Sequence, residues 1–362
     1  MPFNRLQPML IASLLPLLVF TWFSRDYIGQ IDFWLLWLVA MTLVGLPLVF
    51  AEIGLAHRSG TSPLVGLPML TREADVSTVW RGFGWLTIVL LMAVVGHLLA
   101  SSGEIIHPLV SNIALPALLA IMALLVIGLS FIKHLAGWLA VGFAVAALVV
   151  NVMQGGFVAW QMTATSLTEW AGAVVLALVC VGAGTGLYWH ARTHQMLTMS
   201  TTATDQARES ASRYVLPVWS FQLLAGALIA MTLSPNSAMA AVLNALAMLA
   251  GAAYLLHILT HQVSLRLQQK FNFLALVVLA VLSLALAMVP TAWLNQLIIV
   301  ISLVTAVWLA VFAGWQMKIS HLRKSLNFSS EGLYNLWRIA VRIIVPLAVI
   351  LAMVGWVLGL AK

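Results

Sequence analysis

Long apolar runs separated by short polar segments dominate this chain of 362 residues. A helix needs about 20 apolar residues to cross the hydrocarbon core of a bilayer. The apolar runs between charges, glycines and prolines therefore predict an all-α integral membrane protein with eleven transmembrane helices. In chain order the predicted spans are residues 7–24, 33–56, 82–103, 112–131, 135–153, 170–191, 214–234, 237–262, 271–289, 292–317 and 335–360.

Basic residues test both the number of spans and their direction. If the N-terminus lies in the cytoplasm, all of the 17 Lys and Arg residues except Arg25 and Lys362 fall in cytoplasmic segments. Positive charge concentrates on the cytoplasmic side of membrane proteins, and one miscounted span would destroy this asymmetry. We therefore expect a multi-pass protein with a cytoplasmic N-terminus and an external C-terminus.

Composition narrows the class of protein further. Hydrophobic residues make up 63% of the chain and charged residues 7%, which is not the composition of a soluble domain. The net charge of +7 is spread over the chain rather than gathered in a patch, so a nucleic-acid partner is not expected. The single cysteine, Cys180, lies inside a predicted span and has no second cysteine to pair with.

The sequence contains no motif of enzyme chemistry. A phosphate-cradling loop, a nucleophile elbow, a CxxC pair and a carboxylate dyad are all missing, so we do not expect an enzyme. His257 and His261 stand four residues apart, a spacing compatible with two metal ligands. No Cys or acidic residue lies nearby to complete a metal site, so neither a metal nor another cofactor is expected.

The middle of the chain, residues 169–192, combines an apolar span with three alternating glycines. Gly182, Gly184 and Gly186 surround Thr185, and each glycine weakens a helix by roughly 1 kcal/mol relative to alanine. One interpretation is close helix packing through small residues. The other is a broken helix at a substrate site. Because Gly184 lies on the opposite face from Gly182 and Gly186, we expect a break between Val181 and Gly186, with backbone groups facing a cavity shared with Pro16 and His97.

Several polar or helix-bending residues lie inside other spans. Pro16 predicts a kink in the first span. Glu52, near the cytoplasmic end of the second span, and His97, near the middle of the third, are ionisable groups that mark function or a structural pair. A lone His in a span is more often a structural donor than a ligand. At span ends we expect Tyr188, Trp189 and His190 to form an interfacial belt, and Arg338 and Arg342 to extend to the cytoplasmic interface.

Five ordered stretches together resemble bacterial members of the neurotransmitter:sodium symporter family. They are Gly45–Gly60 around Glu52, Trp80–Trp85, the glycine-rich stretch 169–192, Phe312–Trp315 and Leu336–Pro346. The resemblance implies a LeuT-like fold of two inverted five-helix repeats plus one extra helix, in a bacterial inner (plasma) membrane. The first repeat would be residues 1–153, the second 154–317, and the appended eleventh span would occupy 318–362.

The resemblance also implies where a solute would bind. Family members bind substrate between the broken first and sixth helices, facing the third and eighth. In this sequence these places correspond to Ser13, Pro16, His97, Leu98, Gly182, Gly184, Thr185, Gly186, Tyr254 and His257. The implied ligand is a small organic solute similar to an amino acid.

The departures from the family concern its ion chemistry. The first helix of the family carries a Gly/Asn segment before Trp-Arg-Phe-Pro, whereas no glycine precedes Gly29 here and only Trp22 and Arg25 resemble that motif. The eighth helix offers hydroxyls to sodium, where this chain has Tyr254-Leu-Leu-His257. We therefore expect sodium coupling to be altered or lost, with a proton on Glu52 or His97 as a candidate replacement. Two functions stay open, a secondary transporter and a transport-inactive accessory subunit with a membrane-protein partner.

Overall fold

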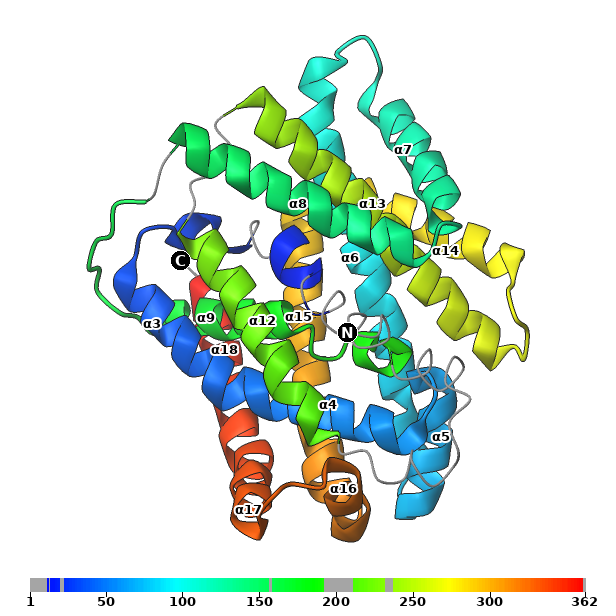
Figure 1. The fold of residues 1–362 in the computed structure, drawn as a ribbon, viewed down its shortest axis with the longest axis vertical. Coiled ribbons are helices and arrows are strands. Elements are labelled where there is room, and N and C mark those ends of the chain that lie inside the picture. Colours follow the sequence, from blue (N-terminus) through cyan, green and yellow to red (C-terminus); the bar gives the residue numbers. More distant parts are fainter. Residues whose placement is uncertain are drawn as a thin grey trace.

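The computed structural model describes residues 12, 14–19, 23–155, 158–191, 211–231 and 237–360, which form a bundle of crossing helices (Figure 1). The α-helices are α3 (Ile31–Ala40), α4 (Leu46–Ser59), α5 (Pro63–Ala74), α6 (Gly82–Ile106), α7 (Leu115–Ser130), α8 (His134–Gly155), α9 (Leu167–Val181), α12 (Ser212–Ala230), α13 (Ala238–Arg266), α14 (Phe273–Ala287), α15 (Thr291–Val311), α16 (Ile319–Leu326), α17 (Glu331–Ile339) and α18 (Val345–Leu360). Short 3-10 helices are η2 (Arg25–Tyr27), η4 (Thr78–Arg81) and η5 (His107–Leu109), and π-helices are η3 (Met41–Gly45), η6 (Phe312–Gln316) and η7 (Ala340–Ile344).

The helices agree with the predicted spans wherever the structure describes them. Seven continuous helical stretches are long and apolar enough to cross a membrane, and α7, α9 and α14 are shorter apolar helices. These ten correspond in order to predicted spans two to eleven. The first predicted span lies only partly within the described residues, and of its two marked residues Pro16 is described and Ser13 is not.

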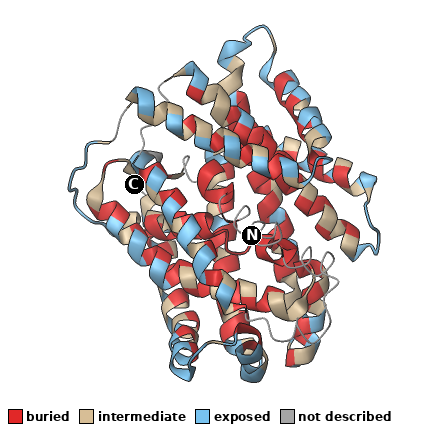
Figure 2. Cartoon of the chain, in the orientation of Figure 1, coloured by how far each residue is buried: buried red, intermediate tan, exposed pale blue. Residues whose placement is uncertain are grey.

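The outer surface of the bundle is apolar, as a lipid-facing surface must be. Burial is concentrated along the inward faces of the helices, and the outward faces are exposed (Figure 2). Large hydrophobic side chains are exposed on several helices, among them Leu124 at 68%, Leu274 at 70% and Leu347 at 63%. Patches of this kind on so many helices fit contact with hydrocarbon rather than with water.

The interior is organised around α6, α9 and α13. Helix α6 packs against α13, α14 and α15, and α13 runs along α8 (Figure 1). Helix α9 packs against α3 and α18 and also contacts α15. The glycine-rich end of α9 is therefore surrounded by protein on several sides.

Two connecting segments that the sequence pattern presents as loops contain helices. Helix α5 follows the polar stretch that ends the second span, and it begins with Pro63 in its first turn, where proline is well tolerated. It buries Leu64, Leu67 and Leu70, which recur at helical spacing. Helix α16 follows the tenth span and buries Leu322 and Leu326. Both helices are too short for a span, so a search for twenty-residue apolar runs misses them.

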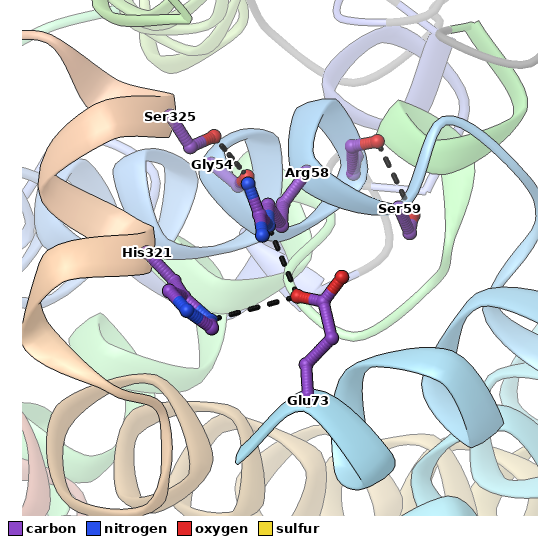
Figure 3. A network of polar contacts seen from close by, with 7 residues as sticks. Gly54, Arg58, Ser59, Glu73, His321 and Ser325 are labelled. Carbon is purple, nitrogen blue, oxygen red and sulfur yellow. Dashed lines mark hydrogen bonds and ion pairs between the residues drawn. The ribbon is translucent and has the colours of Figure 1, made fainter.

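A polar network joins α4, α5 and α16 (Figure 3). The Glu73 carboxylate lies 3.1 Å from Arg58 Nε and 3.5 Å from His321 Nδ1. The Ser325 hydroxyl donates to the Gly54 carbonyl at 2.6 Å. These contacts hold the two short helices against the end of the second span.

Candidate functional site

Helix α9 breaks at the glycine-rich segment, as the sequence predicts. A capping box of Ser166 and Glu169 starts the helix, and the helix ends at Val181. Gly182, Gly184 and Gly186 then have φ angles of +65°, +78° and +73°, and residues 187–191 are helical again. L-residues rarely adopt this left-handed region, whereas glycine enters it at little cost. The alternating glycines therefore interrupt the helix, which the plain close-packing interpretation does not explain.

Glu52 binds the amide groups that the break leaves free. Its Oε2 accepts from the Gly184 N–H at 3.0 Å, and its Oε1 accepts from the Gly186 N–H at 3.2 Å. The side chain is fully buried and comes from α4. The carboxylate therefore lies at the break, and the expectation that Glu52 sits near the cytoplasmic end of its span stays a prediction. A buried carboxylate with two amide donors is a strong fixed bond between the two segments.

Tyr188 and Gln222 bind the carbonyl on the other side of the break. Val181 O accepts from the Tyr188 hydroxyl and, at 3.2 Å, from Gln222 Nε2. Gln222 Nε2 also donates to the Tyr188 oxygen at 2.5 Å. The predicted interfacial belt is wrong here, because Tyr188, Trp189 and His190 are buried, with exposures of 5%, 0% and 2%. These residues belong to the short helical segment that follows the break, and protein surrounds that segment.

The freed backbone groups thus bind side chains of the protein. The prediction that they face a cavity shared with Pro16 and His97 is wrong for the Gly184 and Gly186 amides, which bind Glu52. Helix breaks at membrane depth are tolerated only where the backbone is satisfied by protein or by a wet cavity. At this break, side chains of the protein bind the freed backbone groups.

Three neighbouring segments pack directly on the glycines. A Cβ atom added at Gly182 would lie 2.5 Å from Leu15 Cδ1, and one at Gly186 would lie 3.0 Å from Pro63 Cγ. A Cβ atom at Gly184 would collide with the Thr305 side chain of α15. Leu15 is in the first span, next to buried Pro16, so the structure brings the first and sixth spans together as the resemblance implies.

His97 and Leu98 lie on the inner face of α6. Both are fully buried, and the His97 ring centroid lies 6.0 Å from that of Phe23, at the end of the first span. The neighbouring Gly96 approaches α14, where an added Cβ atom would lie 2.9 Å from Leu286 Cβ. The third span therefore contacts the first span through His97, as expected for a residue of the central region.

Tyr254 and His257 join a cluster of aromatic and imidazole rings. The Tyr254 hydroxyl lies 3.3 Å from Nδ1 of His134, at the start of α8. The His257 ring centroid lies 6.4 Å from those of His134 and His190, and the His190 and His261 centroids are 5.2 Å apart. Among the residues that the structure describes, no three His, Cys, Asp or Glu side chains are placed to hold one metal ion. Sequence reasoning missed His134 and His190, which lie far from His257 in the chain.

The partners of the break that sequence reasoning missed carry little or no signal in the sequence. Gln222 is an amide inside an apolar span, and Tyr188 lies two residues after the last of the three glycines. Thr305 is a small hydroxyl residue in the tenth span, and nothing in its neighbourhood marks it as the residue that fills the glycine turn.

Solved structures share the fold of this chain at low sequence identity. No protein-family profile and no curated protein match the sequence. The crystal structure of MhsT in complex with L-phenylalanine is 15% identical, with a TM-score of 0.72 over 97% of this chain and 98% of that chain. A manganese transporter of Eremococcus coleocola is 12% identical, with a TM-score of 0.60 over 99% and 87%. Mhp1, a nucleobase-cation-symport-1 family transporter with bromovinylhydantoin bound, is 12% identical, with a TM-score of 0.54 over 98% and 92%. The likeness extends over nearly the whole of each chain, and this protein therefore has the LeuT-like transporter fold that its sequence predicts.

Proposed function

We propose that this protein is a secondary transporter of a small organic solute, and not an enzyme. The observation that carries the proposal is the broken helix at residues 182–186, held open by the buried carboxylate of Glu52. A discontinuous helix at membrane depth costs hydrogen bonds, and transporter folds use such helices to form binding sites. The structures with L-phenylalanine and bromovinylhydantoin support an organic solute of similar size.

The contacts suggest how the solute site and the conformational change are linked. We propose that the solute binds beside residues 182–186, against the first span, α6 and α13. Residues 1–153 and 154–317 would move relative to each other as two repeats, with 318–362 appended. Glu52 belongs to the first repeat and holds the broken helix of the second, so the break would move with the first repeat. Leu15 would shift away when the solute enters, because it packs on Gly182.

Solute flux in reconstituted vesicles tests this proposal. The purified protein is placed in liposomes and assayed for exchange of radiolabelled neutral amino acids, with L-phenylalanine as the first substrate. We expect saturable exchange that is lost in Gly184→Ala and kept in Gly128→Ala, a glycine of α7 with nothing within 4 Å of an added Cβ atom. Each variant is first checked for folding by its thermal unfolding midpoint. No exchange of any solute tested by the folded wild-type protein would contradict the proposal.

We further propose that transport does not depend on sodium. Leu255 and Leu256 are buried hydrocarbon at the positions where the related family offers hydroxyls, and the Tyr254 oxygen binds His134. Hard cations need several oxygen ligands. Replacement of sodium by potassium or lithium should leave the exchange rate unchanged, and a steep requirement for sodium would contradict this expectation.

A proton is the candidate coupling ion. Glu52 and His97 are two of the buried ionisable groups of this region. An imposed pH gradient should drive solute accumulation in wild-type vesicles. His97→Gln should abolish that accumulation but keep solute exchange if His97 carries the proton, and unchanged accumulation would assign the proton elsewhere.

A transport-inactive accessory subunit is the second candidate function. It is favoured by the closed surroundings of the break, where Tyr188 and Gln222 bind the Val181 carbonyl and Thr305 fills the turn. This function predicts no flux and a stoichiometric membrane-protein partner during mild purification. Flux by the isolated chain would exclude it.

We propose a bacterial inner-membrane location with the N-terminus in the cytoplasm and the C-terminus outside. In a Cys180→Ala background, Lys324→Cys should react with an impermeant thiol reagent only from the cytoplasmic side, and Gln161→Cys only from outside. Labelling of position 324 from outside would contradict the eleven-span topology.

A further inference from the structure

A basic pocket of about 960 Å³ opens between the end of the tenth span, α16 and η7. Lys318, Arg323, Lys324 and Arg342 line it, together with Asn327 and Trp315. No carboxylate is among its lining residues. The basic residues of this segment are cytoplasmic in the proposed topology, so the pocket lies at the inner headgroup level.

Two acidic groups lie near α16, and only one of them, Glu331, pairs with a residue of the pocket. Glu73 binds Arg58 and His321 on another face of the helix, and the Ser325 bond to Gly54 holds that face against α4 (Figure 3). Glu331 lies 3.1 Å from Arg323, where both side chains are more than half exposed, and such a surface pair is weak. The pocket therefore keeps an excess of positive charge.

Arg342 is held at the inner wall of the pocket. Its Nε donates to the Gly314 carbonyl, and its guanidinium lies 5.1 Å from the centroid of the Trp315 ring. Trp315 Nε1 lies 3.4 Å from the Arg342 carbonyl, and the indole is 59% exposed. These contacts fix the arginine between the tenth and eleventh spans, and its extension to the cytoplasmic interface stays a prediction. An exposed indole beside fixed charge is typical of the headgroup region.

A separate apolar groove lies on the same two spans as the pocket, the tenth and the eleventh. It has a volume of about 340 Å³ and is lined only by apolar side chains of α15, α18 and η4. Val311, Trp308 and Val304 line it, and they stand 4, 7 and 11 residues before Trp315 and so lie on the same helix face. On the eleventh span, Ile350 and Met353 follow Arg342 by about two and three turns. Positive charge thus lies at the headgroup level, and an apolar groove lies one to three turns deeper.

We propose that this pocket and groove bind one anionic phospholipid of the cytoplasmic leaflet. The phosphate of the headgroup would bind the four basic side chains, and Asn327 would donate to its oxygens. One acyl chain would lie in the groove of α15 and α18. Basic pockets between membrane helices on the cytoplasmic side suit anionic headgroups, because each Lys or Arg near the surface contributes about 1 kcal/mol.

Native mass spectrometry of the detergent-purified full chain tests the proposal. The probes are phosphatidylglycerol and phosphatidylcholine with identical acyl chains. The test variant is Lys318→Gln with Lys324→Gln, and the control is Arg266→Gln with Lys270→Gln, which removes the same charge at the end of α13. We expect phosphatidylglycerol to bind the wild-type protein preferentially and to bind the test variant roughly tenfold more weakly. The control variant should bind like the wild-type protein.

Three results would overturn the proposal. Equal binding of the two lipids would show that the charge of the headgroup is not recognised. An equal loss in the control variant would show attraction by overall charge alone. Full competition by soluble glycerol phosphate at the lipid's own concentration would identify a free phosphate site rather than a lipid site. Lys318 and Lys324 are exposed, so the double variant should unfold at the wild-type temperature, which is measured in parallel.

Discussion

The chain departs from regular α-helix in two ways, and the two use different chemistry. At residues 182–186 the helix stops, three glycines adopt left-handed angles and a buried carboxylate binds the freed amides. In η3 and η7 the helix continues through a wider π-turn, whereas α15 ends in the π-turn of η6, and the residues before all three π-turns keep right-handed angles. The first departure interrupts the helix, whereas η3 and η7 insert a residue into a continuing helix.

Neutral indole donors bind two of the carbonyls at the π-turns. Trp219 Nε1 donates to the Met41 carbonyl at 3.0 Å, and Trp315 Nε1 lies 3.4 Å from the Arg342 carbonyl. The two kinds of departure also touch, since a Cβ atom at Gly45 in η3 would lie 3.0 Å from Val181 Cγ1. At the break, left-handed glycines leave two amides that one buried carboxylate binds, whereas at the π-turns single carbonyls accept from an indole in η3 and η7 and from the Arg342 guanidinium in η6. Substitutions at the two places should therefore differ in their effect.

The largest effect is expected for Gly184→Ala. The left-handed angle costs an L-residue roughly 1–2 kcal/mol, and overlap with Thr305 adds roughly 1–3 kcal/mol. The thermal unfolding midpoint in detergent should fall well below that of the wild-type protein. Gly128→Ala is the control, since an added Cβ atom there meets nothing within 4 Å.

A second variant separates the two causes. Gly184→Ala combined with Thr305→Ala removes part of the overlap but keeps the unfavourable angle, so the midpoint should recover only in part. Full recovery would mean that the left-handed angle is not required. The break would then not differ from the π-turns in its need for glycine.

Glu52→Gln is expected to have the next largest effect. An amide keeps the shape of the side chain, but it turns an NH₂ donor toward one of the two glycine N–H donors and loses the charge. The loss should be about 2–3 kcal/mol, because hydrogen bonds to buried charged groups are strong and an unpaired donor is costly. Glu104→Gln, at an exposed carboxylate of α6, is the control and should leave the midpoint unchanged. A Glu52→Gln protein as stable as the wild type would show that the charge is not what holds the break.

The sequence predicted the parts of this fold that depend on local patterns. Apolar length gave spans two to eleven, because a bilayer sets the length of a helix regardless of its neighbours. Alternating glycines gave the break, because left-handed angles leave a visible trace in residue type. Helices α5 and α16 were not predicted, because each is short and is stabilised by contacts such as the Ser325 bond to Gly54.

The partners at the candidate site could not be predicted in the same way. Glu52 and Gly184 are 132 residues apart, and their bond depends on how α4 crosses the end of α9. The same holds for Gln222 and Val181, which come from different spans. The π-turn η7 contains neither glycine nor proline, so its residues give no indication of a π-turn. Long-range packing determines these features, and a single sequence does not record it.

The smallest effect is expected for Trp219→Phe, which tests the role of the indole donor at the π-turn η3. Phenylalanine keeps an aromatic ring in α12 but removes the Nε1 donor to the Met41 carbonyl. A neutral hydrogen bond contributes about 1 kcal/mol, so the midpoint should fall clearly less than in Glu52→Gln. Trp293→Phe, at an indole that is 72% exposed, is the control for the loss of an indole. If Trp219→Phe were as harmful as Glu52→Gln, the π-turn of η3 would depend on its donor as strongly as the break depends on its carboxylate, and the two departures would follow one rule.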